Sequence, residues 1–171
     1  MRHIIGIVLQ NESGALSRVT GLFSTRGYNI ESLSVAPTND PTVSRITLVT
    51  TGPDAVIRQI VAQLMKLVDV VAVNDMTEGD HLERELVLLR LRLDPMASDA
   101  VRGFVVRAGG RVLDPAPEGF IVELTASEAE VNEFVRHLAK GPTEILEIAR
   151  SGALGISRQL RPMRAVRRQP G

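Results

Sequence analysis

Hydrophobic and polar positions follow the same order of spacings twice along the chain. In each half they predict a strand, a helix, two strands joined by a turn, a second helix and a last strand, the order βαββαβ. In the first half we expect strands at His3–Leu9, Asn29–Ala36, Val43–Thr50 and Val68–Val73. The first helix has its apolar stripe at Leu16–Phe23, and the second opens at Gly52 and Pro53 with its stripe at Ile57–Leu67. In the second half we expect the corresponding segments at Leu86–Leu93, Val101–Ala108, Arg111–Asp114, Phe120–Thr125, Val131–Leu138 and Glu144–Ala149.

Residues that begin or end helices support this division. Gly27 follows the first helical stripe, Gly109 and Gly110 follow the third, and Gly141 with Pro142 follows the last. Ser127 and Glu130 have the spacing of a capping box at the start of the last helix.

The repeated order predicts the fold class α+β, with two tandem ferredoxin-like domains. Such a unit folds most simply as an antiparallel sheet with both helices on one face and its first and third strands in the centre. This leaves the other sheet face and an edge strand uncovered, so we expect a homodimer. The predicted domains are residues 1–76 and 82–158, joined by the polar stretch Thr77–His81 as the only linker. An Arg- and Pro-rich tail, residues 159–171, is expected to be disordered.

Composition narrows the classes of partner and compartment. Lys plus Arg equals Asp plus Glu at 20 each, so no nucleic-acid partner is expected. The absence of cysteine removes disulfides, thiolate metal sites and thiol nucleophiles. No apolar run approaches the ~20 residues of a membrane span, and the N-terminus lacks a signal-peptide pattern. We therefore expect a cytoplasmic protein with no membrane partner.

The residues that would carry catalysis or bind a metal do not form a recognisable group. His3, His81 and His137 lie far apart on different predicted elements, and they have no metal-ligand spacing. Glu83 and Glu85 are read as the polar start of a strand. Phosphate-loop and dinucleotide-binding glycine patterns are both absent from the sequence. We expect no catalytic residue, no metal site and no cofactor on this chain.

The stretch Asn11–Leu16 is the best candidate for a ligand site. A strand turns here directly into a helix, and Gly14 lets the backbone approach a ligand closely. The first N–H groups of a helix have no internal acceptor and carry partial positive charge, which suits a small carboxylate. The alternative is that Asn11 or Ser13 caps the helix and Gly14 only forms the turn. The local pattern leaves both interpretations open.

Residues 11–50 closely resemble the N-terminal ACT domain of acetohydroxyacid (acetolactate) synthase small subunits, most specifically from Arg26 to Thr38. The similarity continues through Lys66–Leu88 and returns at Ile145–Gly152, so that it spans roughly residues 2–158.

The resemblance implies an amino-acid-binding ACT domain, a second ferredoxin-like domain and a homodimer. It implies a non-catalytic regulatory subunit that activates a catalytic large subunit in branched-chain amino acid biosynthesis and confers feedback inhibition by valine. Thiamine diphosphate, FAD and Mg²⁺ belong to the catalytic partner in that family. Leucine or isoleucine are effectors in some relatives.

The family's effector site maps onto two segments of this chain. The loop contributes Asn11, Gly14, Ala15 and Leu16, and the neighbouring chain of the dimer contributes Asn29 and Ile30. The resemblance implies that helix N–H groups hold the valine carboxylate and that asparagine oxygens accept from its ammonium. Ile30 then forms an apolar wall for the branched side chain.

Two other classes of function stay as alternatives to the regulatory subunit. A free-standing amino-acid sensor acting on transcription would need a DNA-binding element, and no helix-turn-helix pattern is evident. An enzyme with a concealed site would need a catalytic group that the sequence does not display. The second half lacks the Asn-x-x-Gly signature at Arg92–Met96, so no second valine site is expected there.

Overall fold

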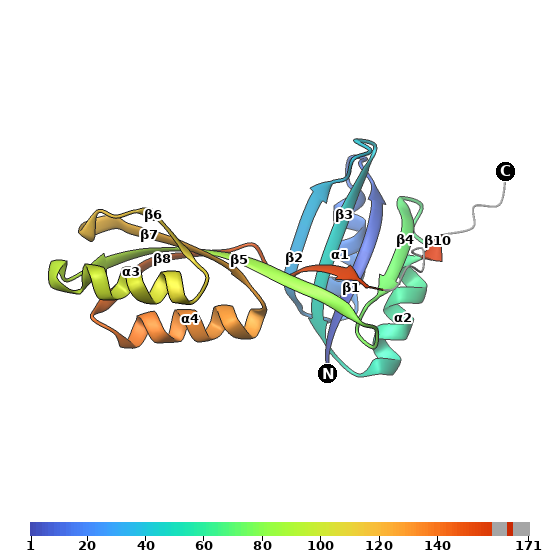
Figure 1. Ribbon diagram of the computed structural model, residues 1–171. Helices are drawn as coiled ribbons and strands as arrows, with labels where there is room; N and C mark the ends of the chain where they lie inside the picture. Colours follow the sequence, from blue (N-terminus) through green and yellow to red (C-terminus); the bar gives the residue numbers. More distant parts are fainter. Residues whose placement is uncertain (159–163, 166–171) are drawn as a thin grey trace. The chain divides into compact units, whose positions relative to one another are not determined.

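The computed structural model describes residues 1–158 and 164–165, and these form two compact units (Figure 1). One unit contains Met1–Leu82 together with the described residues from Ala153 onward, and the other contains Glu83–Gly152. Most of the expected disordered tail lies outside the described residues. Within it, Arg164–Ala165 forms the short strand β10, which pairs antiparallel with β4.

The first unit has the predicted βαββαβ order. Its elements are β1 (Arg2–Gln10), α1 (Ala15–Thr25), β2 (Ile30–Pro37), β3 (Val43–Thr51), α2 (Asp54–Leu64) and β4 (Val70–Asp75). The sheet order β10-β4-β1-β3-β2 places β1 and β3 in the centre and β2 at an edge. The neighbouring strands β1, β3, β2 and β4 pair antiparallel, as the fold class requires.

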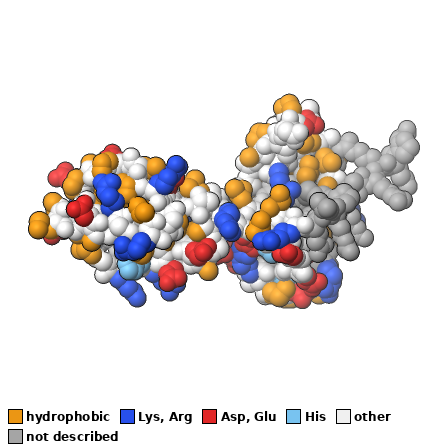
Figure 2. Space-filling model, in the orientation of Figure 1, with side chains coloured by type: hydrophobic (Ala, Val, Ile, Leu, Met, Phe, Trp, Pro, Cys, Tyr) orange, Lys and Arg blue, Asp and Glu red, His pale blue; other side chains and the backbone are white. Residues whose placement is uncertain are grey.

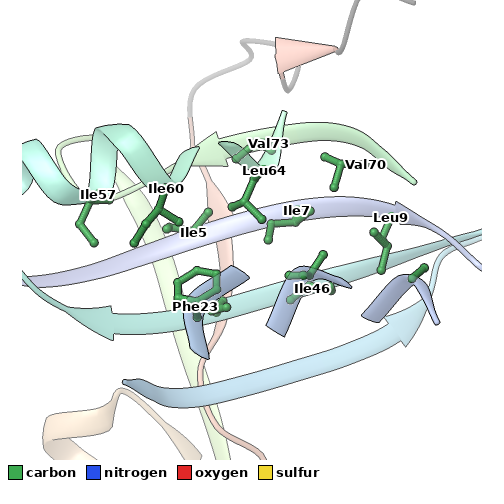
Figure 3. Close-up of a cluster of buried hydrophobic side chains, with 13 residues drawn as sticks. Ile5, Ile7, Leu9, Phe23, Ile46, Ile57, Ile60, Leu64, Val70 and Val73 are labelled. Atoms are coloured by element: carbon green, nitrogen blue, oxygen red, sulfur yellow. The ribbon is translucent and has the colours of Figure 1, made fainter. Parts of the chain in front are cut away.

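One face of this sheet packs against both helices. Alternate residues of β1 and β3 point to that face, and α1 and α2 each present an apolar stripe to it (Figure 3). The buried core consists of Ile5, Ile7, Leu9, Ala15, Val19, Phe23, Ile46, Leu48, Ile57, Ile60, Leu64, Val70 and Val73. The position of α1 on this core fixes the direction in which its N-terminus opens at the end of β1.

The second unit repeats the arrangement. Its elements are β5 (His81–Leu93), α3 (Ser98–Arg107), β6 (Arg111–Asp114), β7 (Phe120–Ala126), α4 (Glu128–Lys140) and β8 (Thr143–Arg150), with 3₁₀ turns at Pro95–Ala97 and Pro117–Gly119. The strand order β6-β7-β5-β8 again places the first and third strands of the unit in the centre. Ser127 and Glu130 form the predicted capping box at the start of α4. The fold class of two ferredoxin-like units is confirmed.

The opposite face of the first sheet is not left uncovered as expected. The short strand β9 (Leu154–Ser157) lies against it (Figure 1), and Ala153 is buried there beside Ile4, Val49 and Met76. The sequence places residues 153–158 in the second domain, whereas in the structure they belong to the first unit. The chain passes between the units twice, and Thr77–His81 is not the only linker.

Candidate functional site

The turn between β1 and α1 leaves backbone N–H groups open to a ligand. Gly14 is the N-cap of α1 with φ 80° and ψ −5°, a left-handed conformation that favours glycine, and no side chain of residues 1–158 caps this helix. Among the described residues, the N–H groups of Leu16 and Ser17 have no hydrogen-bond acceptor. The capping alternative is thus absent at this helix, and its partial positive charge is available to an anion.

Ala15 and Leu16 play different structural parts in this turn. The side chain of Ala15 is buried and packs into the first core. Leu16 is 39% exposed, so its apolar side chain borders the loop on the solvent side. A ligand held on the helix N–H groups would have Leu16 as an apolar neighbour.

Asn11 is tied to the start of β3. Its backbone N–H donates to the carbonyl of Thr42 at 2.8 Å, and its side-chain Nδ2 donates to the carbonyl of Pro41 at 3.2 Å. The Ser44 hydroxyl donates to Asn11 Oδ1 at 3.3 Å. These bonds fix the direction of the Asn11 amide, and Oδ1 keeps a second lone pair for a further donor.

Arg18 and Asp69 form an ion pair beside the loop that the sequence pattern did not reveal. Arg18 Nε donates to the Asp69 carboxylate at 2.5 Å, and the Asp69 side chain is only 7% exposed. A second nitrogen of Arg18 donates to the carbonyl of Ser13 at 3.4 Å. The hydrogen bond to Asp69 raises the pKa of Arg18 above its ordinary value. The position of Arg18 one turn into the helix was visible in the sequence, but its long-range partner was not.

Within one chain, the two halves of the predicted site lie far apart. Ile30 pairs with Thr50, and Thr50 pairs with His3 at the start of β1. Asn11 follows Gln10, at the other end of β1. Seven residue steps along a strand correspond to about 24 Å, so Asn29 and Ile30 cannot reach the loop of their own chain. Asn29 is exposed, Ile30 is half-buried, and the Asn29 carbonyl accepts from Thr50 Oγ1 at 2.6 Å.

In the corresponding turn of the second unit, a side chain of the turn itself accepts a backbone hydrogen bond. Asp94 precedes the 3₁₀ turn at Pro95–Ala97, and its carboxylate accepts from the N–H of Met96 at 2.9 Å. A carboxylate of the protein thus accepts from a backbone N–H at this turn, whereas no side chain among the described residues does so at the start of α1. This difference has a simple physical cause, since Asp is a good N-cap and glycine has no side chain.

The other candidate residues have structural partners. Arg150 donates to both oxygens of the Glu85 carboxylate, at 2.9 and 2.6 Å, so Glu85 is a buried ion-pair partner within β5 and not only a polar residue at the start of a strand. The three histidines lie on different elements, and the described residues contain no cluster of His, Asp or Glu placed to hold a metal ion. No helix in the described part of the chain is long and apolar enough to span a membrane. Figure 2 shows Lys and Arg interspersed with Asp and Glu on the face in view.

Comparison with protein families identifies both units. Residues 5–72 match the family model described as "AHAS small subunit-like ACT domain", and residues 84–159 match "Small subunit of acetolactate synthase".

Individual relatives match over nearly the whole chain. The small subunit of acetolactate synthase isozyme 3 from Escherichia coli is 44% identical over 164 residues, which cover 96% of this chain and 100% of that protein. The acetolactate synthase small subunit of Haemophilus influenzae is 44% identical over 158 residues, which cover 92% of this chain and 96% of the relative. A crystal structure of the acetolactate synthase small subunit from Thermotoga maritima superposes with a TM-score of 0.84 at 31% identity, covering 93% of this chain and 98% of that one. The chain therefore belongs to the family of acetolactate synthase small subunits.

Proposed function

We propose that this chain is the regulatory subunit of acetohydroxyacid synthase in branched-chain amino acid biosynthesis. It binds and activates a catalytic large subunit, and it makes that enzyme sensitive to valine. Thiamine diphosphate, FAD and Mg²⁺ belong to the large subunit, and this chain contributes no catalytic residue, metal or cofactor. The complex is placed in the cytoplasm, as the sequence leads us to expect.

The observation that carries the valine site is the uncapped N-terminus of α1. The N–H groups of Leu16 and Ser17 have no acceptor within the described part of the chain, and Gly14 turns the chain without a side chain that would block them. A carboxylate accepts such bonds with strong charge assistance. Arg18 adds a full positive charge beside the same turn, although Asp69 offsets part of it.

A second copy of the chain can supply Asn29 and Ile30 to the loop, which the same residues of its own chain cannot reach. Strand β2 lies at the edge of the first sheet, with no further strand beside it among the described residues. If β2 of a second chain pairs antiparallel along this edge, its first residues lie beside Pro37 of this chain. Pro37 is at the same end of the sheet as Pro41 and the loop, because it pairs with Ser44. Antiparallel pairing thus brings the partner's Asn29 and Ile30 toward the helix N-terminus.

In this arrangement each group of the amino acid has a suitable neighbour. The helix N–H groups hold the carboxylate, while Asn11 Oδ1 and the partner's Asn29 amide oxygen accept from the ammonium. Leu16 and the partner's Ile30 enclose the branched side chain. A site shared across two chains also links effector binding to dimer geometry, which is a physical basis for feedback.

The decisive experiment is an activity assay of the matching catalytic subunit with and without this chain, over a valine titration. We expect higher acetolactate formation with the chain and inhibition as valine rises. The pure chain alone should form no acetolactate from pyruvate. Activity of the pure chain, or a mixture that responds to neither this chain nor valine, would contradict the proposal. Co-purification with operator DNA in place of a thiamine enzyme would favour the transcriptional sensor.

A further inference from the structure

Residues 153–158, here called the crossing segment, are anchored to the first unit at several points. The N–H of Ala153 donates to Ser32 Oγ on β2 at 3.3 Å, and the N–H of Gly155 donates to Thr47 Oγ1 on β3 at 3.4 Å. Arg45, also on β3, donates to the carbonyl of Gly155 at 2.9 Å. The N–H of Arg158 donates to the carbonyl of Asp80 at 2.9 Å. Two adjacent strands of the sheet are thus bonded to one short segment.

The side of the crossing segment that faces the sheet consists of small residues because there is no space for larger ones. Ala153 is 6% exposed and packs with Ile4, Val49 and Met76. A Cβ on Gly155 would lie 2.8 Å from Ile4 Cδ1 and 2.8 Å from Met76 Cε. Both of those side chains are fully buried and have little room to move away. Because of this close fit, we expect the crossing segment to move together with the sheet.

The crossing segment also continues directly from the second unit. Strand β8 ends at Arg150, and only Ser151 and Gly152 separate it from Ala153. At its other anchor, Ser32 lies three residues after Asn29 on the strand that carries half of the proposed valine site. A displacement of β2 relative to β3 must therefore move the crossing segment or break its hydrogen bonds.

We propose that the crossing segment couples effector binding in the first unit to the second unit. This inference rests on the proposed function and adds the element that transmits it. Valine bound at β2 and the loop changes the relative positions of β2 and β3, and the anchored segment passes that change to β8. A variant of such a coupling element changes the inhibition by valine but leaves the affinity for valine nearly unchanged.

The test uses full-length variants that loosen the crossing segment without touching the proposed site. Gly155→Val places a branched side chain against Ile4 and Met76 in a strand conformation that valine favours. Its matched control is Gly119→Val in the second unit, where a Cβ has no neighbour within 4 Å and φ is not positive. The milder pair Ser32→Ala and Thr47→Val removes the two acceptors while keeping nearly the same volume.

Three quantities are measured for each variant: valine affinity by calorimetry, activation of the catalytic subunit, and the valine concentration for half inhibition. For Gly155→Val we expect affinity and activation within about twofold of the wild type and half inhibition at valine concentrations at least tenfold higher. The double variant Ser32→Ala/Thr47→Val should shift half inhibition in the same direction by a smaller factor. If the melting curve of Gly155→Val shows that this variant does not fold, the double variant alone tests the proposal. Gly119→Val should match the wild type.

Two outcomes overturn the inference. If the folded variants bind valine and are inhibited at the wild-type concentration, the crossing segment does not transmit the response. If they lose valine binding together with inhibition, the segment maintains the site itself and is not a coupling element. Failure of the proposed function would be recognised separately, because the wild-type chain would then bind no valine at all.

Discussion

At the scale of single residues, Gly14 and Arg18 set the backbone conformation and the charge at the start of α1. Gly14 has φ 80°, and an added Cβ would lie 3.1 Å from a terminal nitrogen of Arg18. Arg18 is itself held by the buried carboxylate of Asp69. A cation near a helix N-terminus is unfavourable for the helix, and the pairing with Asp69 offsets that effect. The local charge balance is therefore sensitive to a single new side chain.

We expect Gly14→Asp to abolish valine feedback and to leave the chain folded. Two negative charges about 4 Å apart repel by roughly 4 kcal/mol at an effective dielectric near 20, before screening. Even a third of that, about 1.4 kcal/mol, weakens binding tenfold. The new carboxylate can also attract Arg18 away from Asp69. The measurement is a valine titration of the reconstituted enzyme, with a melting curve of the variant.

The control for this variant is Gly14→Ala, which adds the Cβ without the charge. The positive φ costs roughly 1–2 kcal/mol for a residue with a Cβ. Because Asp is a better helix N-cap than Ala, Gly14→Asp should melt at a temperature no lower than Gly14→Ala. Gly14→Ala should lose less valine sensitivity than Gly14→Asp. Undiminished inhibition of a folded Gly14→Asp dimer would remove the helix terminus from the effector site.

At the scale of elements, the edge strand β2 has two expected roles, in dimer pairing and in the valine site. Asn29 immediately precedes it, and the Asn29 side chain is exposed in the single chain. We expect Asn29→His to keep activation of the catalytic subunit but to resist valine. The substitution removes the amide oxygen that we propose accepts from the ammonium, and it puts a larger ring in its place. The assay compares activation and valine inhibition in the same reconstituted enzyme.

The oligomeric state separates the two roles of this position. Light scattering of Asn29→His after size exclusion should give the same mass as the wild type. A variant that becomes monomeric and loses activation together with valine response would show that Asn29 holds the dimer and not the ligand.

Helix α4 provides a test of local structure by pH. The Ser127 hydroxyl and backbone N–H both donate to the Glu130 carboxylate, and these hydrogen bonds lower the pKa of Glu130 below its ordinary value of 4.5. A lowered pKa in the folded state contributes stability above pH 4.5, and this is lost as the pH falls further. We therefore expect Glu130→Ala to lower the melting temperature at neutral pH and to differ progressively less below pH 4.5.

Glu133→Ala on the same helix is the control, because Glu133 has no hydrogen bond to the N-cap. Its effect on the melting temperature should lack the same decrease at acid pH. Ser127→Ala, which removes the other half of the capping box, should cost about 1 kcal/mol at neutral pH. A constant effect of Glu130→Ala from pH 7 to pH 3 would contradict the assigned role.

At the scale of the whole molecule, the crossing segment changes what a truncated chain can do. A chain of residues 1–80 contains every predicted site residue, and the sequence alone leads us to expect that it dimerises and binds valine. It also lacks Ala153 and Gly155, which cover Ile4, Val49 and Met76. Full exposure of one large apolar side chain costs roughly 1.5–3 kcal/mol. We therefore expect the truncated chain to unfold at lower denaturant concentration than the first unit of the full chain.

The measurement is chemical unfolding of both proteins, followed by valine calorimetry of the truncated chain under folded conditions. Ala153→Glu in the full chain is a second way to disturb the same contact and should destabilise it in the same direction. Equal midpoints for the truncated and full-length first unit would mean that the crossing segment contributes no stability. Absence of valine binding by a folded chain 1–80 would show that the site needs residues beyond it.

The sequence alone determined the features that depend on local spacing. Apolar periodicity predicted both βαββαβ units, with β6 at its observed ends and most other boundaries within a few residues. The spacing of Ser127 and Glu130 predicted the capping box, and the pattern at Asn11–Leu16 predicted a helix N-terminus with a glycine turn. These features are local, because capping and amphipathic spacing act within one or two turns of the chain.

Only the tertiary structure decided the features that join distant residues. The partner of Arg18 is Asp69, and the partner of Glu85 is Arg150. Residues 153–158 lie on the first sheet because Gly155 has no side chain to keep it away from Ile4. The sequence pattern assigns these residues to the second domain, whereas the structure places them in the first unit. Local spacing could not predict this, because neither a glycine nor an ion-pairing residue specifies its distant partner through it. Sequence periodicity thus determined which elements form, and packing across the sheet determined which distant segments meet.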